Sequence, residues 1–336
     1  MQQFTKLIAT IVVTSSLLFG AAAAQAKTLN VYTYSSFSAD WGVGPKVKQG
    51  FEAICGCELK YTSLDDGVSV LNRIRLEGAQ SVADVVIGLD TNITETAANT
   101  GLFAEHGLDL STTPVPTGWS HAQFVPFDYG YFSFIYNSEV VKNPPTSMQE
   151  LIDAPDSLKI VIQDPRTSTP GLGLLLWMKE IYGDDAPAKW AQLAPKIVTV
   201  TKGWSEAYYT IFQSGEADMV LSYTTSPAYH ITVEQDEKYK GADFSEGHYM
   251  QIEVAAKLKA ASEPELADMF LQYIGSDEFQ SFIPQGQWMY RLGAGDAGVP
   301  DSFDSLVKPA KTLLIDPVIV EANRKAWVNE WQNALK

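Results

Sequence analysis

Two short segments of the chain combine flat aromatic rings with small hydroxyl residues at the ends of apolar runs. One covers residues 203–208 and contains Trp204, and the other covers residues 222–229 and contains Tyr223 and Tyr229. The faces of Trp and Tyr rings carry negative charge density that attracts a positive ring. Nearby Ser and Thr hydroxyls can hydrogen-bond the edge of such a ligand. The pattern therefore predicts a site for an aromatic cation, and binding of this kind needs no nucleophile.

Polar residues stand at two expected helix starts. Asp66, followed by Gly67, comes after a strand-like run and opens a helical pattern. Asp is a favoured N-cap, worth about 1 kcal/mol, and it could equally accept a hydrogen bond from a ligand's amino group. Ser168 and Thr169 precede Pro170 at another helix start, where hydroxyls and free amides either cap the helix or receive an anion such as phosphate. Both interpretations stay open for each site.

Further aromatic residues are weaker candidates for the wall of a cleft. Tyr34 and Trp41 follow the first expected strand, and Trp288 stands in the segment 286–290. A single Tyr or Trp more often packs into a core than presents a face to a ligand. Four other tryptophans lie in helix-like stretches and are expected to pack: Trp177, Trp190, Trp327 and Trp331.

The residue types that carry catalysis or bind metals are not arranged for either task. The histidines share no metal-binding spacing: His106, His121, His230 and His248. The chain has no Gly-X-Ser-X-Gly motif and no isolated Cys in an activating pattern. The adjacent Tyr208 and Tyr209 could suggest ferric iron ligation, but neighbouring helix residues point about 100° apart, which favours packing. We therefore expect a binding protein that is not an enzyme and carries no metal or cofactor.

Only two cysteines occur, Cys55 and Cys57, separated by Gly56. In an oxidising compartment they could close a very small disulfide ring, with the glycine permitting the tight bend. A Cys-X-Cys metal site is the alternative, but no His or third Cys lies near in sequence. The pattern favours the disulfide.

The first 26 residues are typical of a signal peptide. Lys6 precedes an apolar run over residues 7–24, and small residues near Ala26 predict cleavage before Lys27 and a periplasmic location. No later segment is long and apolar enough to insert into a membrane. The formal charge of −16 argues against nucleic acid or anionic membranes as partners and mildly favours cationic ligands.

The remaining chain of about 310 residues is long enough for two domains. Strand-like runs at 29–34, 58–61 and 83–89 alternate with helix-like runs at 45–53 and 68–77. Helix-connected parallel strands indicate an open α/β sheet, and such sheets bind ligands beyond the carboxyl ends of their strands. The same alternation returns later in the chain, at 159–163, 171–182, 197–201, 205–214 and 217–223.

Two extended segments could cross between the α/β units. They are residues 124–132, which are rich in aromatic side chains, and residues 249–256. Two crossings would make both domains discontinuous and joined by a hinge, which suits closure around a ligand. We predict one domain from residues 27–128 plus 250–280 and a second from residues 129–249 plus 281–336.

Over essentially the whole mature chain, the sequence closely resembles the periplasmic thiamine-binding proteins of bacterial ABC importers. These have the type II periplasmic binding protein fold, with two α/β domains, a hinge and a ligand cleft between the domains. The segments that carry the resemblance are residues 31–34, 39–42, 124–131, 163–171, 199–204 and 222–229. Relative to the family pattern, the chain carries one extra residue between Tyr208 and Phe212.

The resemblance implies a monomeric receptor that binds thiamine and its phosphates and delivers them to a membrane permease powered by a separate ATPase. The alternative is a receptor of the same fold for another small cation or for ferric iron. Carried over position by position, the family's ligand contacts fall on Asp66, Gly67, Ser168, Thr169, Trp204, Tyr223, Thr224, Thr225, Ser226 and Pro227. Further candidates for the cleft wall are Tyr34, Trp41, Tyr229 and Trp288.

Overall fold

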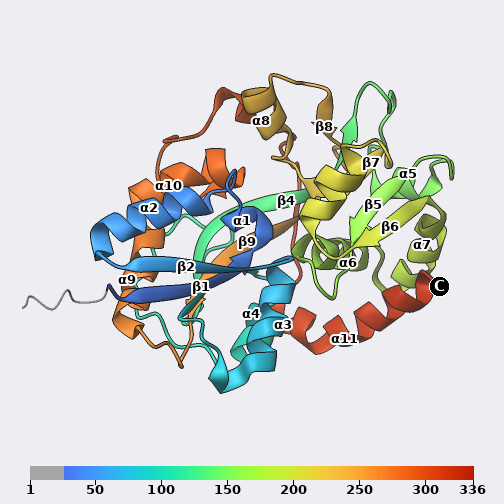
Figure 1. Cartoon of the computed structure of the whole chain (residues 1–336). Helices are drawn as coiled ribbons and strands as arrows, with labels where there is room; N and C mark the ends of the chain where they lie inside the picture. The colour runs from blue at the N-terminus through green and yellow to red at the C-terminus, as the bar shows by residue number, and fades with distance from the viewer. Residues whose placement is uncertain (1–25) are drawn as a thin grey trace, which may run out of the picture.

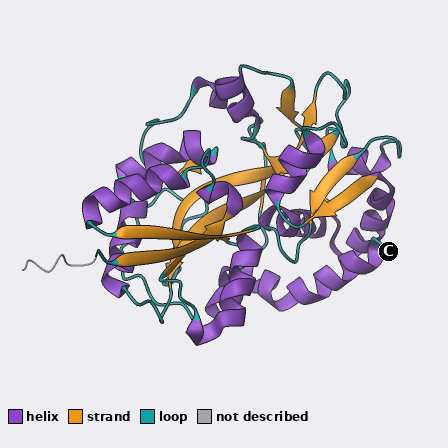
Figure 2. Cartoon of the chain, in the orientation of Figure 1, coloured by secondary structure: helices purple, strands orange, loops and turns teal. Residues whose placement is uncertain are grey.

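A curled, mixed sheet of eleven strands runs through both halves of the chain in the computed structural model, which describes residues 26–336. Helices cover the sheet, as Figure 2 shows. The main path of hydrogen-bonded strands is β2 (Glu58–Leu64), β1 (Thr28–Tyr34), β3 (Val85–Asp90), β9 (His248–Lys257), β4 (Val125–Asn137), β7 (Met219–Tyr223), β5 (Ile160–Gln163) and β6 (Ile197–Thr201). Three short strands pair off this path: β8 (Tyr239–Gly241), β10 (Tyr290–Arg291) and β11 (Thr312–Leu313). The predicted signal peptide lies outside the described residues, except for Ala26.

The first part of the chain forms the predicted β-α-β-α-β unit. Strand β1 is parallel to both β2 and β3, and the connections contain α1 (Ser35–Ser38), α2 (Gly44–Cys55) and α3 (Gly67–Glu77). Helix α2 ends at Gly56, whose φ of 60° lies in the left-handed region that glycine adopts without strain. Cys55 and Cys57 on either side of it form a disulfide bond.

A second α/β unit follows, also as predicted. Strand β5 is parallel to β6 and β7, with α6 (Thr169–Tyr182) and α7 (Ala186–Leu193) in the connection between β5 and β6. The hydroxyl of Ser147 accepts a hydrogen bond from the Glu150 amide at the start of α5 (Met148–Asp153) and so caps this helix.

Strands β4 and β9 lie between two groups of strands, β2-β1-β3 on one side and β7-β5-β6 on the other, and join them into one sheet (Figure 1). The first part of β4 pairs with β9, and its second part pairs with β7. Strand β9 pairs in addition with β3. The predicted crossing by residues 124–132 is therefore confirmed, because this one strand is hydrogen-bonded to both groups. The domain boundaries drawn from the sequence stay a prediction.

The remaining helices cover the two units. Three helices lie near the C-terminus: α9 (Pro264–Ile274), α10 (Asp277–Phe282) and α11 (Pro317–Ala334). The shorter ones are α4 (Thr94–Ala98), α8 (Pro227–Tyr229), the π-helices η4 (Glu206–Phe212), η5 (His230–Glu234) and η6 (Ile283–Gln287), and the 3-10 turns η1 (Gly78–Gln80), η2 (Gly183–Asp185), η3 (Ala194–Lys196) and η7 (Asp301–Ser305). None of the described helices is both long and apolar enough to cross a membrane.

The helix tryptophans pack as predicted. Trp177, Trp190 and Trp331 are buried, and the rings of Trp190 and Trp331 meet edge to face across α7 and α11. Trp327 is half-buried beneath the ammonium group of Lys179. These four side chains pack in or against the core, and none of them lines the pocket described below.

The segment expected to form an ordinary helix over residues 205–214 differs from that expectation. It forms the π-helix η4, in which the Gln213 amide donates to the carbonyl of Tyr208, five residues earlier. A π-turn holds one residue more than an α-turn at the same place. The turn is therefore wider than the predicted one, and the extra residue that the resemblance implies between Tyr208 and Phe212 stays a prediction.

Candidate ligand-binding cleft

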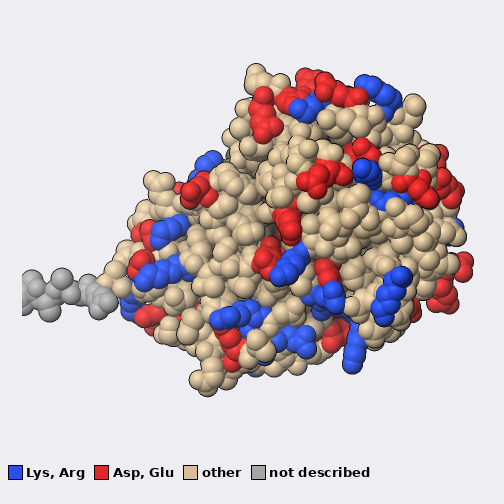
Figure 3. Space-filling model, turned by 45° about the vertical axis from the view of Figure 1, so that its right-hand side comes forward, with Lys and Arg blue, Asp and Glu red and all other residues tan. Residues whose placement is uncertain are grey.

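A pocket of about 750 Å³, including space open to solvent, lies between the two groups of strands. Its wall includes residues that follow the carboxyl ends of parallel strands, namely Tyr34 of β1, Asp66 after β2, Trp204 after β6 and Tyr223 of β7. That is where open α/β sheets bind ligands. The surface in Figure 3 is hollowed between the two lobes, with acidic side chains beside the hollow.

An aromatic cluster forms one wall of the pocket. The ring of Trp204 stacks on Tyr208, with centroids 4.9 Å apart and planes 28° apart. Tyr209 stands edge-on to Trp204 at 5.4 Å and to Trp41 at 5.3 Å. The indole nitrogen of Trp204 donates to the Ser222 hydroxyl at 2.7 Å, which fixes the orientation of the ring. The wall is thus a preformed electron-rich surface.

Tyr229 and Trp288 form a second aromatic pair on the pocket wall. Their rings meet edge to face with centroids 5.6 Å apart. Trp288 has a φ of 59°, a left-handed conformation that is rare for a bulky residue. Its amide donates to the Ile283 carbonyl, which closes η6. Strained backbone of this kind concentrates at functional sites because the surrounding structure must hold it in place.

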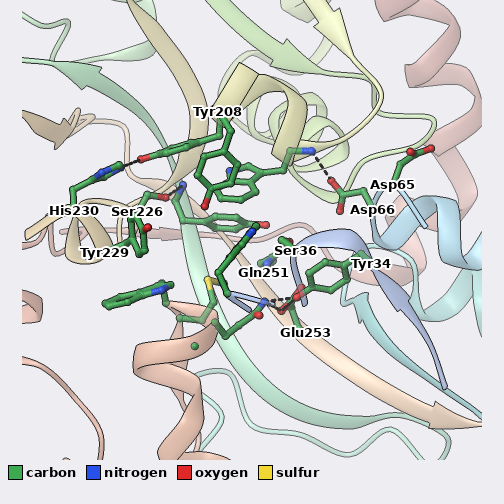
Figure 4. A pocket seen from close by; sticks show the side chains of 18 residues that line it. Tyr34, Ser36, Asp65, Asp66, Tyr208, Ser226, Tyr229, His230, Gln251 and Glu253 are labelled. Carbon is green, nitrogen blue, oxygen red and sulfur yellow. Dashed lines mark hydrogen bonds between the residues drawn. The ribbon is translucent and has the colours of Figure 1, made fainter. Parts of the chain in front are cut away.

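Asp66 links three segments of the chain. Its carboxylate caps α3 by accepting from the Gly67 amide at 2.8 Å, and it accepts from the Ser168 hydroxyl at 2.7 Å and the Trp204 amide at 3.3 Å. Burial raises the pKa of Asp66 to about 6. The predicted cap is confirmed, and the same side chain lines the pocket (Figure 4).

Three further carboxyl groups lie in a row across the sheet below the pocket. Glu253 of β9 is the cross-strand neighbour of Asp90 on β3 and of Asp128 on β4, and all three are buried. Burial raises the pKa of Glu253 to about 8 and that of Asp90 to about 6. Burial and the charge of Glu253 raise the pKa of Asp128 well above its usual range. The hydroxyl of Tyr34 donates to Glu253 at 2.9 Å.

No basic side chain neutralises this group of acids at close range. Within residues 26–336, the ion pairs within 4.0 Å involve none of Asp66, Asp90, Asp128 and Glu253. Arg324 acts on Asp90 only from a longer distance. Buried carboxyl groups without cationic partners favour either protonation or a nearby positive charge. The pocket is therefore suited to a cation.

The family model described as "Bacterial extracellular solute-binding protein" matches residues 80–311. The "Thiamine-binding periplasmic protein" of Escherichia coli (strain K12) is 57% identical over 307 residues, which are 91% of this chain and 93% of that protein. The chain belongs to the family of periplasmic thiamine-binding proteins, within the bacterial extracellular solute-binding proteins. The "Thiamine-binding periplasmic protein" of Haemophilus influenzae is 41% identical over 335 residues, which are 98% of this chain and 99% of that one.

Solved structures agree with the family assignment. A "Periplasmic thiamin binding protein" has a TM-score of 0.90 and 56% identity, and the match covers 93% of this chain and 97% of that chain. The "Ferric binding protein from Campylobacter jejuni" has a TM-score of 0.75 at 18% identity, with 91% of this chain and 99% of that chain covered. At that identity the likeness shows a shared fold alone. The predicted fold class, a type II periplasmic binding protein, is confirmed.

The alternative of ferric iron finds no support in the site. Residues 26–336 contain no group of three or more His, Cys, Asp and Glu side chains placed to hold a metal ion. The hydroxyl of Tyr208 is hydrogen-bonded to His230 at 2.8 Å, while Tyr209 packs against Trp41. Both tyrosines also pack against Trp204 and line the pocket, whereas their spacing predicted packing alone.

The structure places the predicted site residues in two layers. Eight line the pocket: Tyr34, Trp41, Asp66, Trp204, Tyr223, Ser226, Tyr229 and Trp288. Six lie behind its wall: Gly67, Ser168, Thr169, Thr224, Thr225 and Pro227. The hydroxyl of Ser168 donates to Asp66, and that of Thr169 donates to Asp90 at 3.0 Å. In this structure these two hydroxyls position carboxyl groups.

Sequence reasoning missed other lining residues. They are Ser36, Asp65, Tyr208, Tyr209, His230, Gln251, Glu253, Gly286, Gln287 and Met289. A signal existed for Gln251 and Glu253, which are the polar residues in the otherwise apolar strand segment 249–256. Two residues apart on a strand, they share a face of the sheet. Polar side chains on a buried face indicate a site, whereas the extended pattern of the segment by itself predicts only a crossing.

Proposed function

We propose that this protein is the periplasmic receptor of an ABC importer and that it binds thiamine in the pocket between its two lobes. One observation carries the proposal: a preformed aromatic wall stands beside four buried carboxyl groups that form no ion pairs within residues 26–336. Thiamine supplies the matching chemistry, since its thiazolium ring is permanently positive and aromatic. The high identity to thiamine-binding relatives supports the same ligand.

In the proposed complex, the thiazolium lies against the faces of Trp204 and Tyr223, and the aminopyrimidine donates to Asp66. The hydroxyethyl arm, or the phosphate of a thiamine phosphate, reaches the start of α6 at Ser168 and Thr169, whose hydroxyls can hydrogen-bond it. Contact with those two hydroxyls requires them to leave Asp66 and Asp90. We therefore expect both thiamine and its phosphates to require this rearrangement when the arm reaches α6.

Binding closes the two lobes about strands β4 and β9, which act as the hinge between residues 27–128 plus 250–280 and residues 129–249 plus 281–336. The closed monomer is then recognised by the membrane permease, which a separate ATPase powers. The protein works in the periplasm after cleavage near Ala26. It needs no cofactor, and no reaction occurs on this chain, so the vitamin is released intact.

Calorimetry tests this function directly. We expect the mature protein to bind thiamine with one-to-one stoichiometry, and mass spectrometry of protein purified without added ligand is expected to reveal retained thiamine. Chromatography of the released ligand is expected to show unaltered thiamine. Failure to bind thiamine or its phosphates, after removal of any retained ligand by unfolding and refolding, would contradict the proposal.

A further inference from the structure

Gln251, on the central strand β9, has a buried amide group without any hydrogen-bond partner among residues 26–336. Its side chain is 0% exposed, and neither its amide oxygen nor its amide nitrogen is paired. The same side chain lines the pocket and projects among the labelled aromatic residues in Figure 4. Buried amides are nearly always paired because an unpaired one loses its bonds to water without replacement. An amide left free at a pocket wall is therefore available to a ligand.

Glu253, the neighbour of Gln251 on the same face of the strand, is by contrast hydrogen-bonded. Glu253 already accepts hydrogen bonds from the hydroxyl of Tyr34 at 2.9 Å and from the amide of Gln287 at 3.1 Å. Gln251 pairs only through its backbone, as the neighbour of Gly130 on β4. Of these two polar residues of β9, Gln251 alone offers both a free donor and a free acceptor.

A primary amide holds a donor and an acceptor side by side, about as far apart as a ring nitrogen and an adjacent amino group. Gln uses this match to bind adenine through two parallel hydrogen bonds. The aminopyrimidine of thiamine has the same edge. Building on the proposed function, we infer that Gln251 is a specificity-determining residue that binds the aminopyrimidine through its ring nitrogen and one amine hydrogen. The other amine hydrogen remains for Asp66.

The test combines a change in the protein with a change in the ligand. Gln251→Met keeps the length of the side chain and removes both polar atoms. We expect it to weaken thiamine binding by about 10- to 100-fold, the range for losing a two-point contact. A thiamine analogue that lacks the exocyclic amine is expected to bind the wild type less tightly than thiamine. In Gln251→Met, the preference for thiamine over this analogue is expected to fall by about tenfold.

The matched control is Gln163→Met. Gln163 is also a buried glutamine on a strand, but its amide donates to the Leu221 carbonyl at 3.0 Å and it does not line the pocket. We expect it to lower the melting temperature and leave thiamine affinity unchanged. Gln251→Met removes an unpaired amide, so the melting temperature of its ligand-free form is expected to stay the same or rise.

Each result distinguishes this inference from the proposed function. If the wild type binds thiamine and Gln251→Met keeps the full preference for the amine, this inference fails and the proposed function stands. An equal loss of affinity for both ligands likewise contradicts it, since Gln251 would then act on the pocket as a whole. If the wild type itself does not bind thiamine, both fail. Should Gln251→Met not fold, Gln251→Asn, which withdraws the same amide, is expected to show a smaller loss of the same preference.

Discussion

At the scale of single residues, the pocket joins two kinds of side chain that seldom meet in a core. Aromatic faces attract positive charge at short range, and unpaired carboxyl groups attract it over longer distances. Trp204 and Asp66 touch directly, because the amide of one donates to the carboxylate of the other at 3.3 Å. A substitution at either residue is therefore expected to alter the position of the other.

Trp204→Ala and Tyr223→Ala test the aromatic contribution. A desolvated cation–π contact is worth about 2 kcal/mol, so each change is expected to weaken thiamine binding roughly 30-fold. Both rings lie at the pocket and are only half-buried, so the fold is expected to survive. Calorimetry measures the affinity, and Trp327→Ala, a half-buried Trp on α11, serves as the control with unchanged binding. Unaltered affinity in both pocket variants would refute the stacking.

Asp66→Asn separates the cap from the ligand contact. Asn caps a helix about as well as Asp, so the melting temperature is expected to change little. Loss of the carboxylate is expected to weaken binding of the cation by about tenfold, typical of one charge-assisted bond. The matched control is Asp316→Asn. Asp316 caps α11 by accepting a hydrogen bond from the Val318 amide at 2.8 Å, and it does not line the pocket. Equal affinities for the wild type and Asp66→Asn would remove this role.

Glu253 and Asp128 make the ligand-free protein sensitive to pH. Because their pKa values are raised on folding, the folded chain holds more protons than the unfolded chain above about pH 6.5, so stability falls as pH rises toward about 8. Below about pH 6.5 three histidines with lowered pKa values act in the opposite sense: His121, His230 and His248.

We expect the melting temperature of the ligand-free protein to decrease between about pH 6.5 and 8, while thiamine affinity increases as the acids lose their protons. Melting curves and calorimetry across this range measure both. Glu253→Gln is expected to reduce the slope of each. Stability that rises with pH over the same interval would show that this acid pair is already ionised.

At the scale of elements, local sequence predicted most of the helices and strands. The α/β alternation and the caps at Ser168 and Asp66 are each determined by neighbours in the chain, and the structure contains them. The π-helix η4 was not predicted. A turn that is one residue wider than an α-turn leaves the apolar pattern of the segment looking like that of an ordinary helix. Element type thus followed from the sequence, while the local register at Tyr208 did not.

Gly67→Ala tests how tightly two elements meet at the start of α3. A Cβ atom there would lie 2.3 Å from the Gly88 carbonyl oxygen of β3. Because backbone cannot move aside cheaply, we expect a loss of about 1–3 kcal/mol in the free energy of unfolding. Denaturant titration measures it. Gly275→Ala is the control, since its Cβ would meet only the Gln272 carbonyl at 3.6 Å; equal stability losses in the two variants would exclude this cause.

At the scale of the whole molecule, the site depends on two lobes that share strand β4. Closure about β4 and β9 would bring together walls that come from distant parts of the chain. We expect small-angle X-ray scattering to show a smaller radius of gyration when thiamine is added to ligand-free protein. The control is the Trp204→Ala variant at the same thiamine concentration. This concentration is chosen below the dissociation constant of the variant, so that the variant stays mostly unbound. An unchanged radius in fully bound wild type would argue against hinge closure.

The sequence by itself determined the chemistry of the aromatic wall, the caps, the α/β class and the resemblance to thiamine-binding receptors. Each of these depends on residue type or on spacing within a short segment. Trp204 and Tyr223, for example, follow strand-like runs that end at a predictable edge of the sheet. Such patterns are readable because neighbours in the chain remain neighbours in space.

Only the tertiary structure decided which residues lie at the pocket and which lie behind it. It placed Ser168 and Thr169 behind carboxyl groups, set Asp90, Glu253 and Asp128 in one row, and left the amide of Gln251 free. These relations depend on the register between strands that are far apart in sequence. A shift of one residue in that register would turn each side chain to the opposite face of the sheet, and no local pattern records it.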